Sequence, residues 1–288
     1  MGEDLIKKSS TGRLGVALSG GGARGLAHAG ALAAIEEAGM RPDVIAGVSA
    51  GSVAAVLYAA GNSPARILEL FSNRGFRDFV DLRPRYGGLF NMRPFEKLIR
   101  DNLNGYERLE DLPIPTYIGV TDFDNGVSTE FHQGEIVPRV VASCSIPIVF
   151  RPVNIDGTHY VDGGVLRNHP AWIIRQKCQT LIGVNVSPLK SHPQIDSFVG
   201  VALRTYNLMA KANQRRDMDL CDISVETPEI ASYRTFDLRY VDAVYLSGYI
   251  HTRKALRDNG LWKTSKTTLS STSSSSSSHS TDSPQPES

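Results

Sequence analysis

Residues 15–30 read GVALSGGGARGLAHAG, and this stretch predicts a strand, a glycine turn and a helix in direct succession. The run Leu14–Leu18 is apolar and has the length of a buried strand, while the alanine-rich residues 26–38 are typical of a helix. The glycines between them follow the spacing G-x-G-x-x-G, with which dinucleotide-binding folds hold a pyrophosphate at a helix N-terminus. The stretch therefore predicts an α/β fold whose glycines hold a negative charge, either that of a cofactor or another one.

The dinucleotide interpretation fails further along the chain. Such a site needs an acidic residue about 20 residues after the glycines, at the end of the second strand. The second strand is expected at residues 44–46, and Asp43 stands at its beginning, at the opposite edge of the sheet. We therefore expect no cofactor.

The second strand is followed by GVSAG, the pattern G-x-S-x-G, and then by the apolar helical residues 53–60. Between a strand and a helix this pattern predicts a nucleophile elbow, a tight turn that lifts a serine above the helix N-terminus. Glycines flank the serine because a Cβ atom at either position would clash in so sharp a turn. The alternative is a turn rich in glycine and serine that carries no chemistry. The elbow residues are Gly47, Val48, Ser49, Ala50 and Gly51, with Ser49 as the nucleophile.

The glycine loop then has a different role from phosphate binding. A serine that attacks an ester creates an oxyanion, whose charge needs preorganised N–H donors. The loop ends its strand at the same sheet edge as the elbow, and it leads into a helix N-terminus whose amides are unpaired. We expect an oxyanion hole at Gly20, Gly21, Gly22, Ala23, Arg24 and Gly25. For Arg24 two interpretations stay open: a contact to a substrate phosphate or carboxylate, and a structural pair with a nearby acid.

A serine nucleophile needs a base, and the segment DGG offers one. Asp162 precedes Gly163 and Gly164, so the backbone there can pass close to another group. On its own, D-G-G is usually a turn. His169 follows seven residues after Asp162 and is expected to be a loop residue.

GGGARG, GVSAG and DGG, in this order and at this spacing, resemble the motifs of the patatin-like phospholipase family. ASCSIPIVFRPV at residues 142–153 is similar to the family's segment between elbow and aspartate, and the resemblance extends over about residues 14–188. It implies a lipid acyl hydrolase with a Ser-Asp dyad and no catalytic metal. Carried over, Ser49 is the nucleophile, Asp162 the base and Gly20 to Gly25 the oxyanion-hole loop. The implied partners are membrane phospholipid or lysophospholipid substrates, met in transient contact with the membrane surface.

Two interpretations from other classes stay open. One is an α/β-hydrolase-type esterase or thioesterase with a Ser-His-Asp triad, since the chain order Ser, Asp, His is satisfied by Ser49, Asp162 and either His169 or His251. Only a triad needs a histidine, so replacing each histidine separates it from a dyad. The other is a non-catalytic lipid-binding module, which would not react with a fluorophosphonate probe.

Strand-like and helix-like stretches alternate along the chain, which predicts a three-layer αβα sandwich with a mostly parallel central sheet. Further strands are expected at residues 116–121 and 181–186, and a helix at 135–144. The Arg-rich segment 74–100 is expected to form surface loops and a short helix. Two later helices are expected to gather apolar residues on one side, the first with Phe198, Val201, Ala202, Met209 and Ala212, the second with Val241, Val244, Tyr245 and Ala255. A hydrolase domain at 13–262 is expected between a flexible N-terminus (1–12) and a disordered serine-rich tail (263–288).

Composition narrows the class of protein. The 288 residues carry a formal net charge of +1, which gives no electrostatic reason to expect nucleic acid. Three cysteines without a C-x-x-C pair predict neither a disulfide framework nor a zinc site. No secretory leader and no apolar run of membrane-spanning length is seen, so we expect a cytoplasmic protein that touches membranes peripherally. We expect residues 83–92 to form the contact with the membrane. The alternative is that their aromatic side chains cover the core or line an acyl pocket. The oligomeric state is left open.

Overall fold

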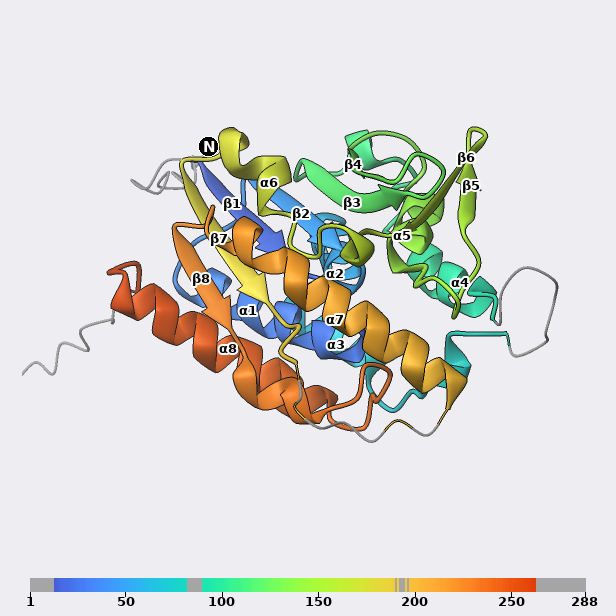
Figure 1. The fold of residues 1–288 in the computed structure, drawn as a ribbon. Helices are drawn as coiled ribbons and strands as arrows, with labels where there is room; N and C mark the ends of the chain where they lie inside the picture. The colour runs from blue at the N-terminus through green and yellow to red at the C-terminus, as the bar shows by residue number, and fades with distance from the viewer. Residues whose placement is uncertain (1–12, 82–89, 190, 192–194, 196, 263–288) are drawn as a thin grey trace, which may run out of the picture.

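The computed structural model describes residues 13–81, 90–189, 191, 195 and 197–262. Their strands form one sheet of order β5-β6-β3-β2-β1-β7-β8, with β4 paired to β3 (Figure 1). The strands are β1 (Leu14–Leu18), β2 (Val44–Val48), β3 (Thr116–Asp122), β4 (Val127–Phe131), β5 (Val153–Ile155), β6 (Thr158–Asp162), β7 (Thr180–Asn185) and β8 (Ile223–Glu226). The termini predicted to be flexible, 1–12 and 263–288, lie outside the described residues.

Five neighbouring strands are parallel, and this confirms the mostly parallel sheet. β3, β2, β1, β7 and β8 run in one direction, while β4, β5 and β6 pair antiparallel at one side. Every residue of β1 and β2 is buried, as in sheets covered on both faces. Leu18 lies beside Gly47 in the register, so the glycine loop and the elbow leave neighbouring strands at the same edge. Asp43 lies at the opposite edge, where its carboxylate accepts a hydrogen bond from the Leu14 amide.

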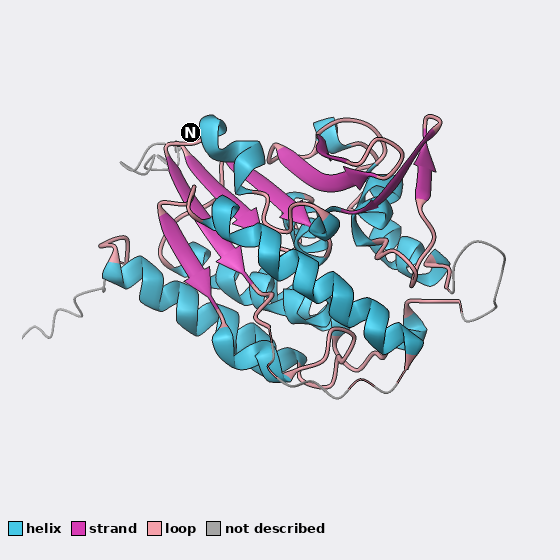
Figure 2. Ribbon diagram, in the orientation of Figure 1, coloured by secondary structure: helices cyan, strands magenta, loops and turns pink. Residues whose placement is uncertain are grey.

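Helices cover both faces of the sheet, and this confirms the three layers (Figure 2). The larger part of the core lies between the sheet and the helices α1, α2, α5 and α8, and the smaller part lies under α6. The helices are α1 (Leu26–Glu37), α2 (Ala50–Ala59), α3 (Pro64–Phe71), α4 (Arg93–Asp101), α5 (Ile136–Cys144), α6 (Ala171–Ile174), α7 (Phe198–Met218) and α8 (Val241–Asp258). No helix in the described part of the chain is long and apolar enough to cross a bilayer.

The apolar sides predicted for the last two helices differ in burial: that of α8 lies in the core, whereas that of α7 is largely exposed. In α8, Val241 and Val244 are buried in the core. In α7, Phe198, Val201 and Met209 are exposed instead. The physical reason is that α7 packs on polar loops at the carboxyl edge of the sheet, so its inner side carries hydrogen-bonding side chains, described below.

The segment 74–100 is more than a solvated surface. It does contain a short helix, α4, but several of its phenylalanines turn inward and pack on one another: Phe76 contacts Phe90, and Phe79 contacts Phe95. Residues 82–89, which include most of the predicted membrane contact, lie outside the described residues. The described end of that contact, Phe90 and Met92, packs toward the core, as its alternative interpretation holds.

Candidate active site

Ser49 occupies the sharp turn between β2 and α2. Its φ of 52° and ψ of −124° are unusual for a residue with a side chain and store strain, as in a nucleophile elbow. Its amide donates to Ser143 Oγ (2.8 Å), and that hydroxyl donates to the Gly119 carbonyl (2.7 Å), so α5 and β3 hold the turn in place. A Cβ atom on Gly47 would lie 2.2 Å from the Gly51 carbonyl oxygen, so this flanking glycine is required sterically.

Asp162 is fully buried at the end of β6. Strand pairing places it opposite Val120 of β3, and its amide donates to the Ser145 carbonyl (3.0 Å). Oδ1 accepts hydrogen bonds from the Gly164 amide and the Tyr206 hydroxyl, both at 2.9 Å. Oδ2 is buried and has no hydrogen-bond partner among the described residues.

The pKa of Asp162 reflects this environment. Burial raises the pKa from 3.8 to about 6, while hydrogen bonds from Ser49, Gly164 and Tyr206 oppose the rise because they favour the charged form. The Ser49 hydroxyl is therefore near the carboxyl group, although no well-formed hydrogen bond joins the two described side chains. In enzymes without bound substrate, the distance between nucleophile and base is often longer than a hydrogen bond, and it shortens when substrate binds.

The glycine loop leaves two amides available to an anion. The Gly20 amide donates to the Asn168 carbonyl (3.1 Å), and the Ala23 amide donates to the Thr235 carbonyl (2.7 Å). In the described part of the chain, no hydrogen bond from Gly21 or Gly22 competes with an incoming oxygen. Of the six residues predicted to form the oxyanion hole, Gly21 and Gly22 are therefore those whose amides are available to an oxyanion.

Close packing requires two of the glycines in this loop. A Cβ atom at Gly21 would lie 2.6 Å from a methyl group of Val186, and one at Gly22 would lie 2.2 Å from the Thr235 carbonyl oxygen. Gly22 also has a φ of +59°. Both glycines let the loop pack against its neighbours.

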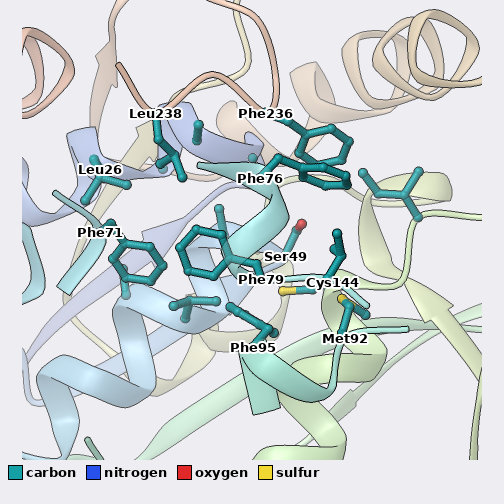
Figure 3. A pocket seen from close by; sticks show the side chains of 18 of the residues that line it. Leu26, Ser49, Phe71, Phe76, Phe79, Met92, Phe95, Cys144, Phe236 and Leu238 are labelled. Carbon is teal, nitrogen blue, oxygen red and sulfur yellow. The ribbon is translucent and has the colours of Figure 1, made fainter. Parts of the chain in front are cut away.

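An apolar pocket opens onto Ser49 (Figure 3). It holds about 870 Å³ of empty space, including its opening to solvent. Ser49 is the only described lining residue whose side chain carries oxygen. The other walls are aliphatic and aromatic, among them Leu26, Phe71, Phe76, Phe79, Met92, Phe95, Cys144, Phe150, Phe236 and Leu238.

The profile of the family described as "Patatin-like phospholipase" matches residues 16–174, which contain the glycine loop, Ser49 and Asp162. The chain belongs to the patatin-like phospholipase family. The match covers most of the region over which the motifs resemble that family, and it ends before α7.

The chain is also similar to known proteins and to a solved structure, in different degrees. An uncharacterized NTE family protein of Mycobacterium tuberculosis is 31% identical over 72% of this chain and 58% of its own length. Lysophospholipase NTE1 of Saccharomyces cerevisiae is 26% identical over 83% of this chain, which spans only 16% of that protein. The crystal structure of VipD from Legionella pneumophila aligns with a TM-score of 0.49 and 16% identity, over 86% of this chain and 67% of that one.

In this patatin-like chain, Arg24 fits neither of its two interpretations. Its side chain is buried, and it donates to the carbonyls of Gly21 (3.3 Å) and Pro188 (2.7 Å) and to Asn207 Oδ1 (3.5 Å). No described carboxylate pairs with it, and burial lowers its pKa to about 10. Arg24 therefore ties the glycine loop to the segment after β7 and to α7.

The described histidines give a triad no support. His169 is buried with no hydrogen-bond partner among the described residues on either ring nitrogen, and burial lowers its pKa to about 3. His251 binds Glu229 through Nε2 (2.9 Å). No described histidine makes a hydrogen bond to Ser49 or Asp162.

The sequence analysis missed Tyr206, Phe236 and Leu238. All three come after residue 174, outside the family match, and they complete the base and the pocket. One signal was present in the chain: uncharged polar residues recur seven apart along α7, at Tyr206 and Asn213 and at Asn207 and Gln214. Asn213 donates to the Gly164 carbonyl (3.0 Å), which places this polar side against the base loop.

Proposed function

We propose that this chain is a lipid acyl hydrolase of the phospholipase A or lysophospholipase type, which uses Ser49 and Asp162 through an acyl-enzyme. One observation carries the proposal: a strained serine opens into an apolar pocket, beside a buried aspartate whose Oδ2 has no hydrogen-bond partner in the described part of the chain. An acyl chain fits a pocket of this chemistry, because burying its methylene groups is favourable.

In the first step the Ser49 oxygen attacks the ester carbonyl as its proton passes to Asp162 Oδ2. The carbonyl oxygen becomes an oxyanion, and the free amides of Gly21 and Gly22 stabilise it together with the helix N-terminus. The intermediate collapses when the alcohol leaves with the proton that Asp162 holds. The acyl group is then an ester on Ser49.

In the second step water attacks this ester. Asp162 accepts a proton from the water, the same amides hold the second oxyanion, and the proton returns to the Ser49 oxygen as the fatty acid leaves. The aspartate starts and ends the cycle charged.

Aspartate can act as this base because of where it lies. An exposed carboxylate with an ordinary pKa accepts a proton from an alcohol poorly. Burial raises the pKa of Asp162 to about 6, which makes it a stronger base that is still ionised at neutral pH. The hydrogen bonds at Oδ1 leave Oδ2 as the oxygen that accepts the proton.

Family membership and the name of the yeast relative, a lysophospholipase, support a lipid substrate. The test is release of fatty acid from phosphatidylcholine and lysophosphatidylcholine by wild type, Ser49→Ala and Asp162→Asn. We expect wild type to release fatty acid and to react with a fluorophosphonate probe, and Ser49→Ala to do neither. Near-native turnover by Asp162→Asn would refute the dyad, and a wild type inert to both lipids and probe would refute the hydrolase.

A further inference from the structure

Helix α7 presents apolar side chains to solvent along one side. Phe198, Val201, Leu208 and Met209 are exposed by 70%, 54%, 47% and 38%, respectively, and we call these four residues the α7 stripe. They are spaced by 3, 10 and 11 residues from Phe198, so helical geometry gathers them on one side. Single exposed apolar residues are ordinary, but four on one side of one helix form a patch that commonly marks an interaction site.

Basic side chains follow the stripe along the same helix. Lys211, Arg215 and Arg216 are exposed, and none of them forms an ion pair with a described residue. One exposed carboxylate, Asp219, stands just beyond the helix. An anionic bilayer has negatively charged headgroups above an apolar layer. The apolar stripe and the three basic side chains, which pair with no described carboxylate, complement these two parts of a bilayer.

The opposite side of α7 reaches the active site. Tyr206 donates to Asp162, and Asn207 donates to Thr235 Oγ1 (3.3 Å). Thr235 leads directly into Phe236, which lines the pocket. The stripe and the candidate active site therefore lie on opposite sides of one helix, which runs across the carboxyl edge of the sheet (Figure 1).

We propose that the α7 stripe docks this protein onto an anionic lipid bilayer. Phe198 and Val201 enter the boundary between headgroups and acyl chains, while Lys211, Arg215 and Arg216 face lipid phosphates. A second copy of the chain would have no need of the unpaired cations. The choice of a bilayer also rests on the proposed function, whose substrates are membrane lipids.

The test is co-sedimentation with phosphatidylcholine vesicles, with and without phosphatidylserine, at low and high salt. Wild type should bind the anionic vesicles, and salt should weaken this binding. Phe198→Ser/Met209→Ser should lower the partition coefficient by about tenfold or more, because two exposed apolar side chains are lost. Lys211→Glu/Arg215→Glu should remove the preference for phosphatidylserine.

A matched control lies on α8, where Leu246 and Ile250 are exposed by 53% and 51%. Leu246→Ser/Ile250→Ser should bind vesicles as wild type does. The proposal is wrong if wild type ignores vesicles, if the α7 variant binds unchanged, or if the α8 variant loses as much binding. It is also wrong if light scattering shows that the α7 variant dissociates a dimer while its vesicle binding is unchanged.

Turnover of a water-soluble ester separates this proposal from the proposed function. The α7 variants should hydrolyse the soluble ester at the wild-type rate. Hydrolysis without any vesicle binding would overturn the docking surface and leave the hydrolase intact. If the protein binds vesicles through the α7 stripe but has no esterase activity, the docking surface stands and the proposed hydrolase function is overturned.

Discussion

The hydroxyl group of Tyr206 donates a hydrogen bond of 2.9 Å to Oδ1 of Asp162, and both side chains are buried. This contact favours the charged carboxylate, so it lowers the pKa of Asp162 against the effect of burial. It also occupies one carboxylate oxygen and leaves the other to the serine. Tyr206 is thus a positioning residue for the proposed base.

Tyr206→Phe should move the pH profile of hydrolysis to higher pH. A hydrogen bond to a charged group contributes about 1.5 kcal/mol, so its loss should shift the rising limb by about one pH unit. The measurement is kcat/KM for a soluble ester from pH 4 to 9. A purely structural role would lower the rate at every pH and leave the midpoint unchanged.

The stability of the fold should depend on pH through Asp162. Its pKa is 3.8 when exposed and about 6 in the folded protein, so this group contributes stability that is fully present below pH 3.8. That contribution is lost as the pH rises through about 6. Two pKa units correspond to about 3 kcal/mol. Between pH 4 and pH 8, the free energy of unfolding of wild type should therefore fall by about this amount relative to that of Asp162→Asn.

Urea unfolding at several pH values measures this difference. Ser49→Ala keeps the aspartate and is the control, and it should lose at least as much stability with rising pH as wild type does, because loss of the Ser49 hydroxyl raises the pKa of Asp162 further. Parallel curves for wild type and Asp162→Asn would mean that the carboxyl group is not desolvated in the folded protein.

The parts of the site that the sequence predicts are those fixed by local backbone geometry. The turn at Ser49 admits only glycine at Gly47, because a Cβ atom there would lie 2.2 Å from the Gly51 carbonyl oxygen. Such requirements leave short motifs with fixed spacing. The strands are equally visible, because β1 and β2 are buried on both faces and consist of apolar runs.

The parts that the sequence does not predict depend on contacts distant in the chain. Tyr206 meets Asp162 across 44 residues. Its helix also breaks the usual amphipathic rule, because polar loops cover its inner side and apolar residues such as Phe198 face outward. Phe76 and Phe236 pack together with ring centres 4.6 Å apart, and no local pattern links them. The pocket therefore follows from tertiary structure alone.

His169→Leu should leave hydrolysis unchanged. The ring is buried, neither nitrogen has a hydrogen-bond partner among the described residues, and burial keeps it neutral by lowering its pKa to about 3. An apolar side chain removes an unsatisfied polar group, so stability should not fall by more than about 1 kcal/mol. Esterase assays and thermal unfolding check both expectations. Loss of turnover in a folded variant would favour the Ser-His-Asp alternative.

Ser49→Gly should be more stable than Ser49→Ala, although both lack the nucleophile. The φ of 52° and ψ of −124° at this position strain any residue with a Cβ atom, and glycine adopts them freely. Relief of the strain stabilises the glycine variant, while the higher entropy of its unfolded chain destabilises it. The net gain should be about 1 kcal/mol. Chemical denaturation of the two variants measures it. Equal stability would mean that the turn relaxes in solution and that the elbow is not strained.

Gly22→Ala should disable the proposed oxyanion hole. The added Cβ atom would lie 2.2 Å from the Thr235 carbonyl oxygen at a φ of +59°, so the loop must move and carry the Gly21 and Gly22 amides with it. Loss of one oxyanion donor lowers kcat by about 100-fold or more, with a smaller effect on KM. Gly39→Ala is the matched control, because its φ of +75° is similarly strained but no atom of the described residues lies within 4 Å of the added one. It should cost about 1 kcal/mol of stability and leave kcat unchanged. A Gly22→Ala variant that raised KM alone would instead make the loop a substrate-binding element.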